Sequence, residues 1–301
     1  MVIDSKRWVT DKECEFYCGQ QKAINRYNAK ITERREKYKQ FNHEGLEKYQ
    51  DVIDSINTKG YAKIENFFDL KQLDLLANEF RQKLKTGEHI KSVQAGSHLQ
   101  LDQPFLNSDY VLDIALDERL VDIATTYYRC TPALGTCNLR RSDVRYTKNN
   151  GTNKFHRDFN SPVKFIKFFV YLNDVNKDNG PFTYVKGSNI KMPRNWQLQH
   201  RWEDSQIVQM YGSESIVHLT ANYGDLLIAT TNGFHKGSQI TKGTRDMLTL
   251  NYVIAPEVRN QSVDEESKRF LISKEQFKSL EDWQVPLVDF LNVEGTTNEL
   301  H

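Results

Sequence analysis

The residue pattern of the chain changes near Ala133, and this change constrains the fold more than any other feature. Before it, apolar residues recur at helical spacing, as in the segment from Leu73 to Leu84. After it, short segments rich in aromatic and β-branched residues alternate with turn signals; they span 164–173, 182–185, 224–230 and 247–254. Helices followed by many short strands are typical of an α+β domain with a β-sandwich or β-barrel at its centre.

Local signals place the other elements. Helices are expected over 22–39, 47–56, 70–86, 112–128 and 273–283, and a short strand is expected over 61–64. Gly60 and Gly87 are helix-ending residues, and Asp69 is a good N-cap for the helix that follows it. Residues 88–108 show neither the helical nor the strand period of apolar residues, and they are expected to form a loop.

These patterns predict three parts of the chain. Residues 1–45 form a helical N-terminal extension, residues 46–256 form the domain, and residues 257–301 form a C-terminal helical tail packed on it. The extension is rich in charged side chains, so a solvated surface helix is the simpler interpretation. The alternative is that it joins a second copy of the chain in a homo-oligomer.

Charge and cysteine content narrow the function classes. The chain has 301 residues, with 41 basic and 40 acidic side chains and a formal net charge of +1. A charge balance this even gives the whole protein no electrostatic field that would attract nucleic acid. The four cysteines are sparse, the N-terminus lacks an apolar leader, and no apolar run approaches the roughly 20 residues that span a bilayer. We therefore expect a cytoplasmic protein with reduced thiols and no membrane contact.

A histidine and a carboxylate lie two residues apart in the segment from Phe155 to Asp158. Residues two apart on an extended strand project to the same face, so His156 and Asp158 can occupy two neighbouring positions of one metal ion. A His-x-Asp pair alone is a weak signal, because it arises by chance in many proteins.

A second histidine strengthens this interpretation. His235 follows the apolar strand 226–230 and is flanked by glycines, so it lies at a strand end. Together, His156, Asp158 and His235 have the composition of the facial triad of non-haem iron(II) oxygenases, which leaves three metal positions open. Arg245 begins the next strand, and its planar guanidinium can hold a carboxylate through two hydrogen bonds.

These motifs, in this order, resemble the phytanoyl-CoA dioxygenase family. The resemblance runs from about Gly60 to Ile254 and includes His156-x-Asp158, the segments 171–188 and 224–238, and Arg245. It implies a double-stranded β-helix core flanked by N-terminal helices. It also implies iron(II), 2-oxoglutarate as cosubstrate, and dioxygen.

The resemblance also assigns residue roles. His156, Asp158 and His235 match the metal ligands of the family, and Arg245 matches the residue that holds the C5 carboxylate of 2-oxoglutarate. The positions that line the cosubstrate pocket in relatives fall near two further residues, Ser238 and Phe169.

The expected activity is that of a dioxygenase that hydroxylates a small molecule and releases succinate and CO2. Halogenases with this fold lack the carboxylate ligand, so the presence of Asp158 favours hydroxylation. Two alternatives stay open. One is a non-catalytic member of the fold that serves binding or assembly, and the other is a cupin-type metal enzyme that does not use 2-oxoglutarate.

The substrate is less constrained by the sequence. Arg141 and Arg145 would share one face of a strand before the metal motif, and they could reach an anionic or zwitterionic small molecule. Arg140 would lie on the other face. The segment 196–212 falls between the metal motifs, where its aromatic residues could cover the site or pack on the barrel.

Overall fold

The computed structural model describes residues 8–9, 21–39, 46–93, 98–144, 153–158, 166–193, 201–254 and 270–295. Outside these residues lie Arg145, residues 196–200 of the segment expected near the site, and two of the four cysteines, Cys14 and Cys18. The other two cysteines, Cys130 and Cys137, are buried free thiols.

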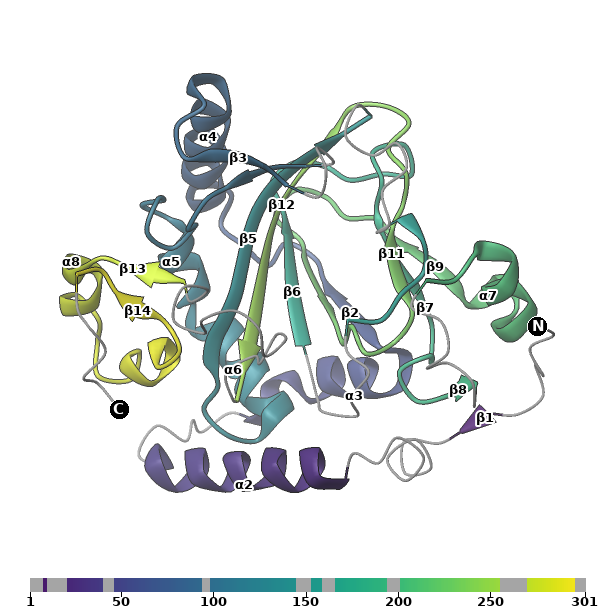
Figure 1. The fold of residues 1–301 in the computed structure, drawn as a ribbon, viewed down its shortest axis with the longest axis horizontal. Helices are drawn as coiled ribbons and strands as arrows, with labels where there is room; N and C mark the ends of the chain where they lie inside the picture. Colours follow the sequence, from purple (N-terminus) through teal and green to yellow (C-terminus); the bar gives the residue numbers. More distant parts are fainter. Residues whose placement is uncertain are drawn as a thin grey trace.

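A seven-stranded antiparallel sheet forms the centre of the molecule (Figure 1). Its strand order is β2 (Tyr61–Ile64), β10 (Leu226–Ala229), β6 (Ile166–Tyr171), β12 (Thr244–Val253), β5 (Ala133–Asp143), β4 (His98–Leu101) and β3 (Ile90–Val93). The expectation of a loop over 88–108 was wrong, because β3 and β4 pair as an antiparallel hairpin. The hairpin extends the sheet at β5, and that contact between distant segments leaves no local signature.

A smaller sheet stands beside the main one. Its order is β11 (His235–Gly237), β7 (Phe182–Val185) and β9 (Ile216–Leu219). Between the two sheets lies a buried cluster that includes Phe169 and Tyr171 of β6, Phe182 of β7 and Leu227 of β10. Two antiparallel sheets that face each other across such a layer are the arrangement expected of a double-stranded β-helix.

Helices cover the other face of the main sheet. They are α3 (Gln50–Lys59), α4 (Leu70–Thr86), α5 (Val111–Ala115) and α6 (Glu118–Tyr128). Alternation along β12 divides its side chains: Leu248 and Leu250 join the helices in the largest core cluster, whereas Met247 packs against the cluster between the sheets. The predicted helix signals are confirmed, since Gly60 ends α3 with a φ of 92° and the Asp69 carboxylate accepts from the Lys71 N–H.

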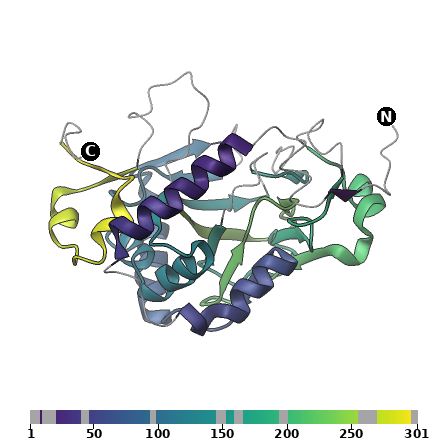
Figure 2. The same ribbon diagram turned by 90° about the horizontal axis from the view of Figure 1, so that it is seen from below.

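Helix α2 (Gln21–Lys37) lies alongside the end of α6 (Figure 2). Its charged composition predicted a solvated helix, yet Arg34 is buried and donates to the carbonyls of Thr131, Pro132 and Pro286. The same guanidinium forms an ion pair with Asp289 at 3.0 Å. Residues from both ends of the chain therefore meet on one side of the domain.

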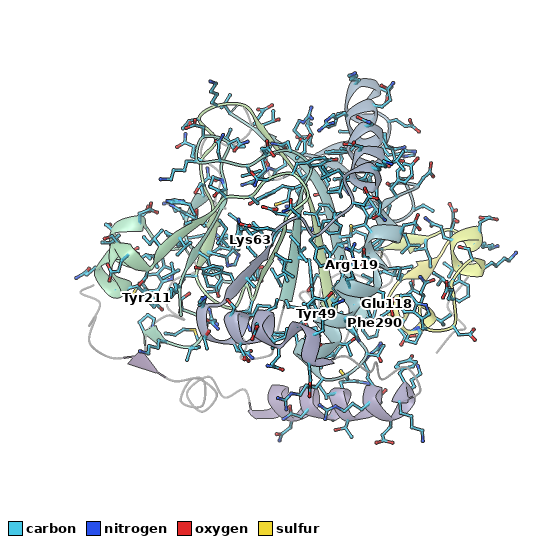
Figure 3. The ribbon with its side chains drawn as sticks, turned by 180° about the vertical axis from the view of Figure 1, so that it is seen from behind. Tyr49, Lys63, Glu118, Arg119, Tyr211 and Phe290 are labelled. Carbon is cyan, nitrogen blue, oxygen red and sulfur yellow. The ribbon has the colours of Figure 1, made fainter. Side chains whose placement is uncertain are left out.

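The remaining elements are short. They are β1 (Trp8–Val9), β8 (Met192–Pro193), α7 (Asp204–Tyr211), β13 (Leu271–Ile272), α8 (Lys274–Lys278), β14 (Asn292–Val293) and three 3₁₀ turns, Leu46–Tyr49, Ser213–Ser215 and Val285–Val288. The helix predicted over 273–283 is only five residues long. Figure 3 shows Tyr211 of α7 at the opposite end of the molecule from Phe290 of the C-terminal segment. Within the described ranges, no helix is long and apolar enough to cross a membrane.

Candidate metal centre

Backbone pairing brings the two histidines together. His156 and His235 face each other at an antiparallel bridge, where His156 N donates to His235 O at 2.9 Å and His235 N donates to His156 O at 3.0 Å. Asp158 N donates to Thr231 O at 3.1 Å, which holds the backbone of the same segment two residues further along. Backbone hydrogen bonds therefore hold the His-x-Asp segment beside the start of β11.

The three side chains converge. One ligand atom from each of His156, Asp158 and His235 lies within 4.8 Å of the others. The Asp158 Oδ1 atom is 4.0 Å from His156 Nε2 and 3.7 Å from His235 Nε2. Each histidine places Nδ1 against a backbone carbonyl, that of Lys154 at 2.9 Å and that of Gly233 at 3.0 Å. A proton on Nδ1 donates to that carbonyl and leaves the Nε2 lone pair for a metal.

The electrostatics favour the ligating forms. Burial, and then the neighbouring His235, lower the pKa of His156 to about 3. Burial opposes ionisation of Asp158, but the positive charge of Lys167 and the contact with His235 outweigh it and hold the pKa of this carboxyl well below its usual value. A metal binds neutral imidazole and ionised carboxylate, and His156 and Asp158 have these forms at neutral pH.

This donor set fits a divalent first-row transition metal. Two imidazoles and one carboxylate with open positions are the ligands of non-haem iron(II) oxygenases. In the described part of the chain, this is the group of histidine, cysteine and acidic side chains close enough to share an ion.

Arg245 offers a site for an anion. It is 7% exposed, its Nη1 donates to Gly180 O, and its Nε has no hydrogen-bond partner among the described residues. Burial lowers the pKa of its guanidinium. A buried cation with an unused donor is stabilised by a carboxylate, so this site fits one end of 2-oxoglutarate. Gly237 lies against the guanidinium, since a Cβ built there would be 3.5 Å from Nη2.

The Phe182 ring lies between Phe169 and the metal ligand His235. The Phe169 and Phe182 ring centroids are 4.5 Å apart, and Phe182 lies 5.4 Å from His235. The structure therefore places Phe169 between the two sheets, next to Phe182. Phe182 was not among the site residues predicted from the sequence. No signal in the sequence marked Phe182, because its contact with His235 depends on the register in which β7 and β11 pair.

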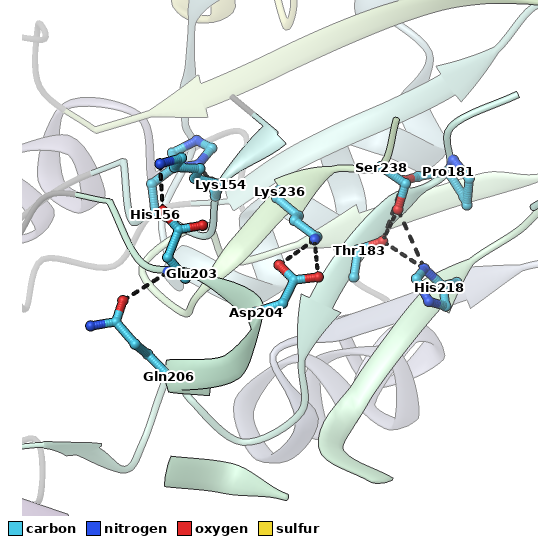
Figure 4. Close-up of polar contacts among 10 residues, drawn as sticks. All are labelled: Lys154, His156, Pro181, Thr183, Glu203, Asp204, Gln206, His218, Lys236 and Ser238. Carbon is cyan, nitrogen blue, oxygen red and sulfur yellow. Dashed lines mark hydrogen bonds and ion pairs between the residues drawn. The ribbon is translucent and has the colours of Figure 1, made fainter. Parts of the chain in front are cut away.

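Ser238 lies elsewhere. Its hydroxyl contacts Thr183 Oγ1 at 2.6 Å and His218 Nδ1 at 3.4 Å (Figure 4). Thr183 pairs with Lys236 across the small sheet, so it projects to the face opposite His235. The structure does not bring Ser238 to the metal ligands.

The arginines of β5 divide between the two faces of the main sheet. Arg141 binds the Asp246 carboxylate through two nitrogens, with Nε–Oδ1 at 2.6 Å. Arg140 projects to the other face and donates to Gln100 Oε1 at 2.6 Å and to Asn138 Oδ1 at 2.9 Å. Because Met247 pairs with Arg140 and faces the interior, the interior arginine of this strand is Arg140. The sequence predicted that the face of this strand with Arg141 would meet the substrate. The structure shows that the face with Arg140 is the inner one.

Helix α7 packs behind the site. The Trp202 ring lies 5.5 Å from that of Phe234, and the Tyr211 ring lies 5.9 Å from it. Lys236 Nζ contacts both oxygens of Asp204, at 2.6 and 2.7 Å, and Lys154 pairs with Glu203 (Figure 4). Trp202 and Tyr211 therefore pack on the barrel. The two ion pairs hold the segments that carry the histidines against α7 and the residue before it.

Comparison with known proteins agrees with this geometry. The family model described as phytanoyl-CoA dioxygenase (PhyH) matches residues 56–247. No curated protein matches the chain significantly. Many solved structures share the fold.

The non-heme alpha ketoglutarate dependent carbocyclase SnoK from nogalamycin biosynthesis has a TM-score of 0.52 and 14% identity, over 67% of this chain and 83% of that one. The epimerase SnoN, in complex with Fe3+, alpha ketoglutarate and nogalamycin RO, has a TM-score of 0.52 and 13% identity, over 73% and 93%. EctD from S. alaskensis, with 2-oxoglutarate and 5-hydroxyectoine, has a TM-score of 0.50 and 17% identity, over 67% and 74%. At identities this low, the structural similarity shows a shared fold and no more. It confirms the predicted double-stranded β-helix.

Proposed function

The chain belongs to the phytanoyl-CoA dioxygenase family, and we propose that it is an iron(II)- and 2-oxoglutarate-dependent dioxygenase. The observation that carries the proposal is the convergence of His156, Asp158 and His235 in one domain with the buried Arg245. A metal site alone would fit many enzymes. A buried arginine with an unused donor adds a place for a dicarboxylate cosubstrate.

Each group has a role in this proposal. His156, Asp158 and His235 hold the iron, and Arg245 holds the far carboxylate of 2-oxoglutarate. When bound, iron(II) with 2-oxoglutarate and dioxygen supplies the oxidising chemistry, and succinate and CO2 are the coproducts. Phe169 and Phe182 form an apolar wall beside His235, which keeps water from the reacting groups.

Two proteins of the same fold support 2-oxoglutarate as the cosubstrate. SnoN and EctD have been crystallised with alpha ketoglutarate or 2-oxoglutarate. Their other bound molecules, nogalamycin RO and 5-hydroxyectoine, are small molecules, which supports a small-molecule substrate here. The interior guanidinium of Arg140 makes an anionic or zwitterionic substrate our preference within that class.

Hydroxylation is the proposed reaction, although the relatives include a carbocyclase and an epimerase. Asp158 supports it, since the carboxylate ligand that halogenases lack is present. Product mass decides the reaction once a substrate is found. Hydroxylation adds one oxygen atom, epimerisation leaves the mass unchanged, and oxidative ring closure removes two hydrogens.

The first experiment is an anaerobic titration of metal-free protein with iron(II) and then 2-oxoglutarate. We expect a visible metal-to-ligand charge-transfer band that is lost in His235→Ala and weakened in Arg245→Ala. Iron binding without the band would favour a cupin-type enzyme that does not use 2-oxoglutarate. If the protein neither binds iron(II) nor shows the charge-transfer band, a non-catalytic protein of this fold would be favoured.

A further inference from the structure

The two oxygens of the Asp158 carboxylate face different partners. Oδ1 lies towards the histidines, 3.7 Å from His235 Nε2 and 4.0 Å from His156 Nε2. Oδ2 lies 2.7 Å from the Nζ atom of Lys167, which forms an ion pair with it. One oxygen is thus directed to the metal position and the other is bound by a lysine.

The sheet fixes the position of Lys167. It lies on β6, paired with Ala229 of β10 on one side and with Asn251 of β12 on the other. The Lys167 side chain is 18% exposed and that of Asp158 is 23% exposed. A lysine on a central strand has little freedom to move away, so the ion pair is more constrained than one on the surface.

A carboxylate can bind a metal through one oxygen or through both. If both oxygens of Asp158 turned to the ion, the second would take one of the three positions that the facial triad leaves open. A partner that holds the second oxygen prevents this.

We propose that Lys167 is a positioning residue that holds Oδ2 of Asp158, so that the carboxylate offers the metal Oδ1 alone. The inference rests on the proposed function, because it concerns the ion that the triad holds. Lys167 acts through Asp158 and keeps the remaining metal positions available for cosubstrate and dioxygen.

A simpler role for Lys167 makes a different prediction. If it only balances the charge of Asp158, then Lys167→Met removes a cation near the ion, and metal binding becomes tighter with unchanged coordination. If it positions the carboxylate, the same variant leaves Oδ2 free to bind the ion as well, and the coordination of the ion changes.

The test is an anaerobic titration of the full chain with Co(II), whose visible absorption reports coordination without any turnover. We expect Lys167→Arg, which keeps a charged donor, to reproduce the wild-type band. We expect Lys167→Met to shift the band, because the second carboxylate oxygen becomes free to bind the ion. Lys63→Met is the matched control, because Lys63 lies on β2 of the same sheet but pairs with Glu65 at 2.8 Å.

The outcomes separate this inference from the proposed function. Wild-type protein that binds no Co(II) contradicts both. Wild-type binding of Co(II) with an unchanged band in Lys167→Met overturns the role of Lys167 and leaves the proposed function standing. If Lys167→Met does not fold, Lys167→Leu takes its place; it also removes the N–H donor, and a shifted band supports the proposal.

Discussion

His156 and His235 lie directly opposite each other at one antiparallel bridge, and each donates its backbone N–H to the carbonyl oxygen of the other. Their ring centroids are 4.4 Å apart. The backbone therefore sets the spacing of the two imidazoles before any metal binds.

Because backbone bonds hold this spacing, replacing either imidazole should remove a ligand without unfolding the site. We expect His156→Ala and His235→Ala to keep the far-ultraviolet circular dichroism of the wild type and to lose at least about 100-fold in iron(II) affinity, or about 2.7 kcal/mol. His218→Ala is the control, since His218 contacts Thr183 on the other face of the small sheet. Equal losses in all three variants would argue against the assigned ligands.

Arg245→Lys should weaken 2-oxoglutarate binding while iron(II) affinity stays unchanged. Lysine keeps the charge but loses the planar pair of donors that binds a carboxylate. We expect a loss of about 10-fold in 2-oxoglutarate affinity, or about 1.4 kcal/mol, measured through the charge-transfer band under anaerobic conditions. Arg141→Lys is the matched control, because Asp246 binds that guanidinium on the outer face. A similar loss in both variants would contradict the role of Arg245.

Gly233→Ala should destabilise the protein near the metal site. A Cβ at Gly233 would overlap the Tyr184 side chain, which donates from its hydroxyl to Thr230 O at 2.8 Å. Overpacking of this kind costs about 1–3 kcal/mol, to be measured by urea unfolding. The control is Gly87→Ala, where a Cβ meets nothing within 4 Å and only the positive φ of 77° opposes the change. A larger loss in the control would refute the packing argument.

Arg34→Ala should loosen helix α2 and the C-terminal segment together. The guanidinium satisfies three carbonyls and pairs with Asp289, so its loss leaves a partly buried carboxylate without its main partner. We expect a loss of about 3–5 kcal/mol in the free energy of unfolding, with faster amide exchange in α2. Arg35→Ala, one residue along the same helix, removes an exposed side chain bonded to Arg129 O and should cost under about 1 kcal/mol.

His98 should make folding sensitive to acid. It is 6% exposed, and burial, together with Arg140 and Arg245, lowers its pKa to about 3. Between the ordinary histidine value of 6.5 and about 3, the unfolded chain binds a proton that the folded chain refuses, so this residue lowers stability as the pH falls.

The variant His98→Gln removes that contribution. We expect its stability to fall less steeply than that of the wild type, by up to about 1.4 kcal/mol per pH unit below pH 6.5. Urea unfolding of both proteins at pH 7, 6 and 5 measures the difference. Parallel pH profiles for the two proteins would show that His98 titrates normally.

Local signals in the sequence were sufficient for several features. Gly60, Gly87 and Asp69 marked helix ends, because caps and left-handed turns depend on neighbouring residues. The spacing of His156 and Asp158 predicted a shared face, because strand alternation is a property of the backbone itself.

Contacts between distant segments decided the rest. Arg34 finds carbonyl partners 97, 98 and 252 residues away, so nothing near it in the chain indicates that it is buried. Alternation separated Arg140 from Arg141, but only the packing of the sheets determined which of the two faces the interior.

The sequence by itself indicated the elements that have clear local signals, the candidate ligand set and the family, since these depend on residue types and their order along the chain. The tertiary structure decided that Ser238 faces away from His235 and that Lys167 binds Asp158. Both depend on which strands pair and in which register. Pairing is set by burial of the whole core, to which every segment contributes, and no short stretch of sequence encodes it.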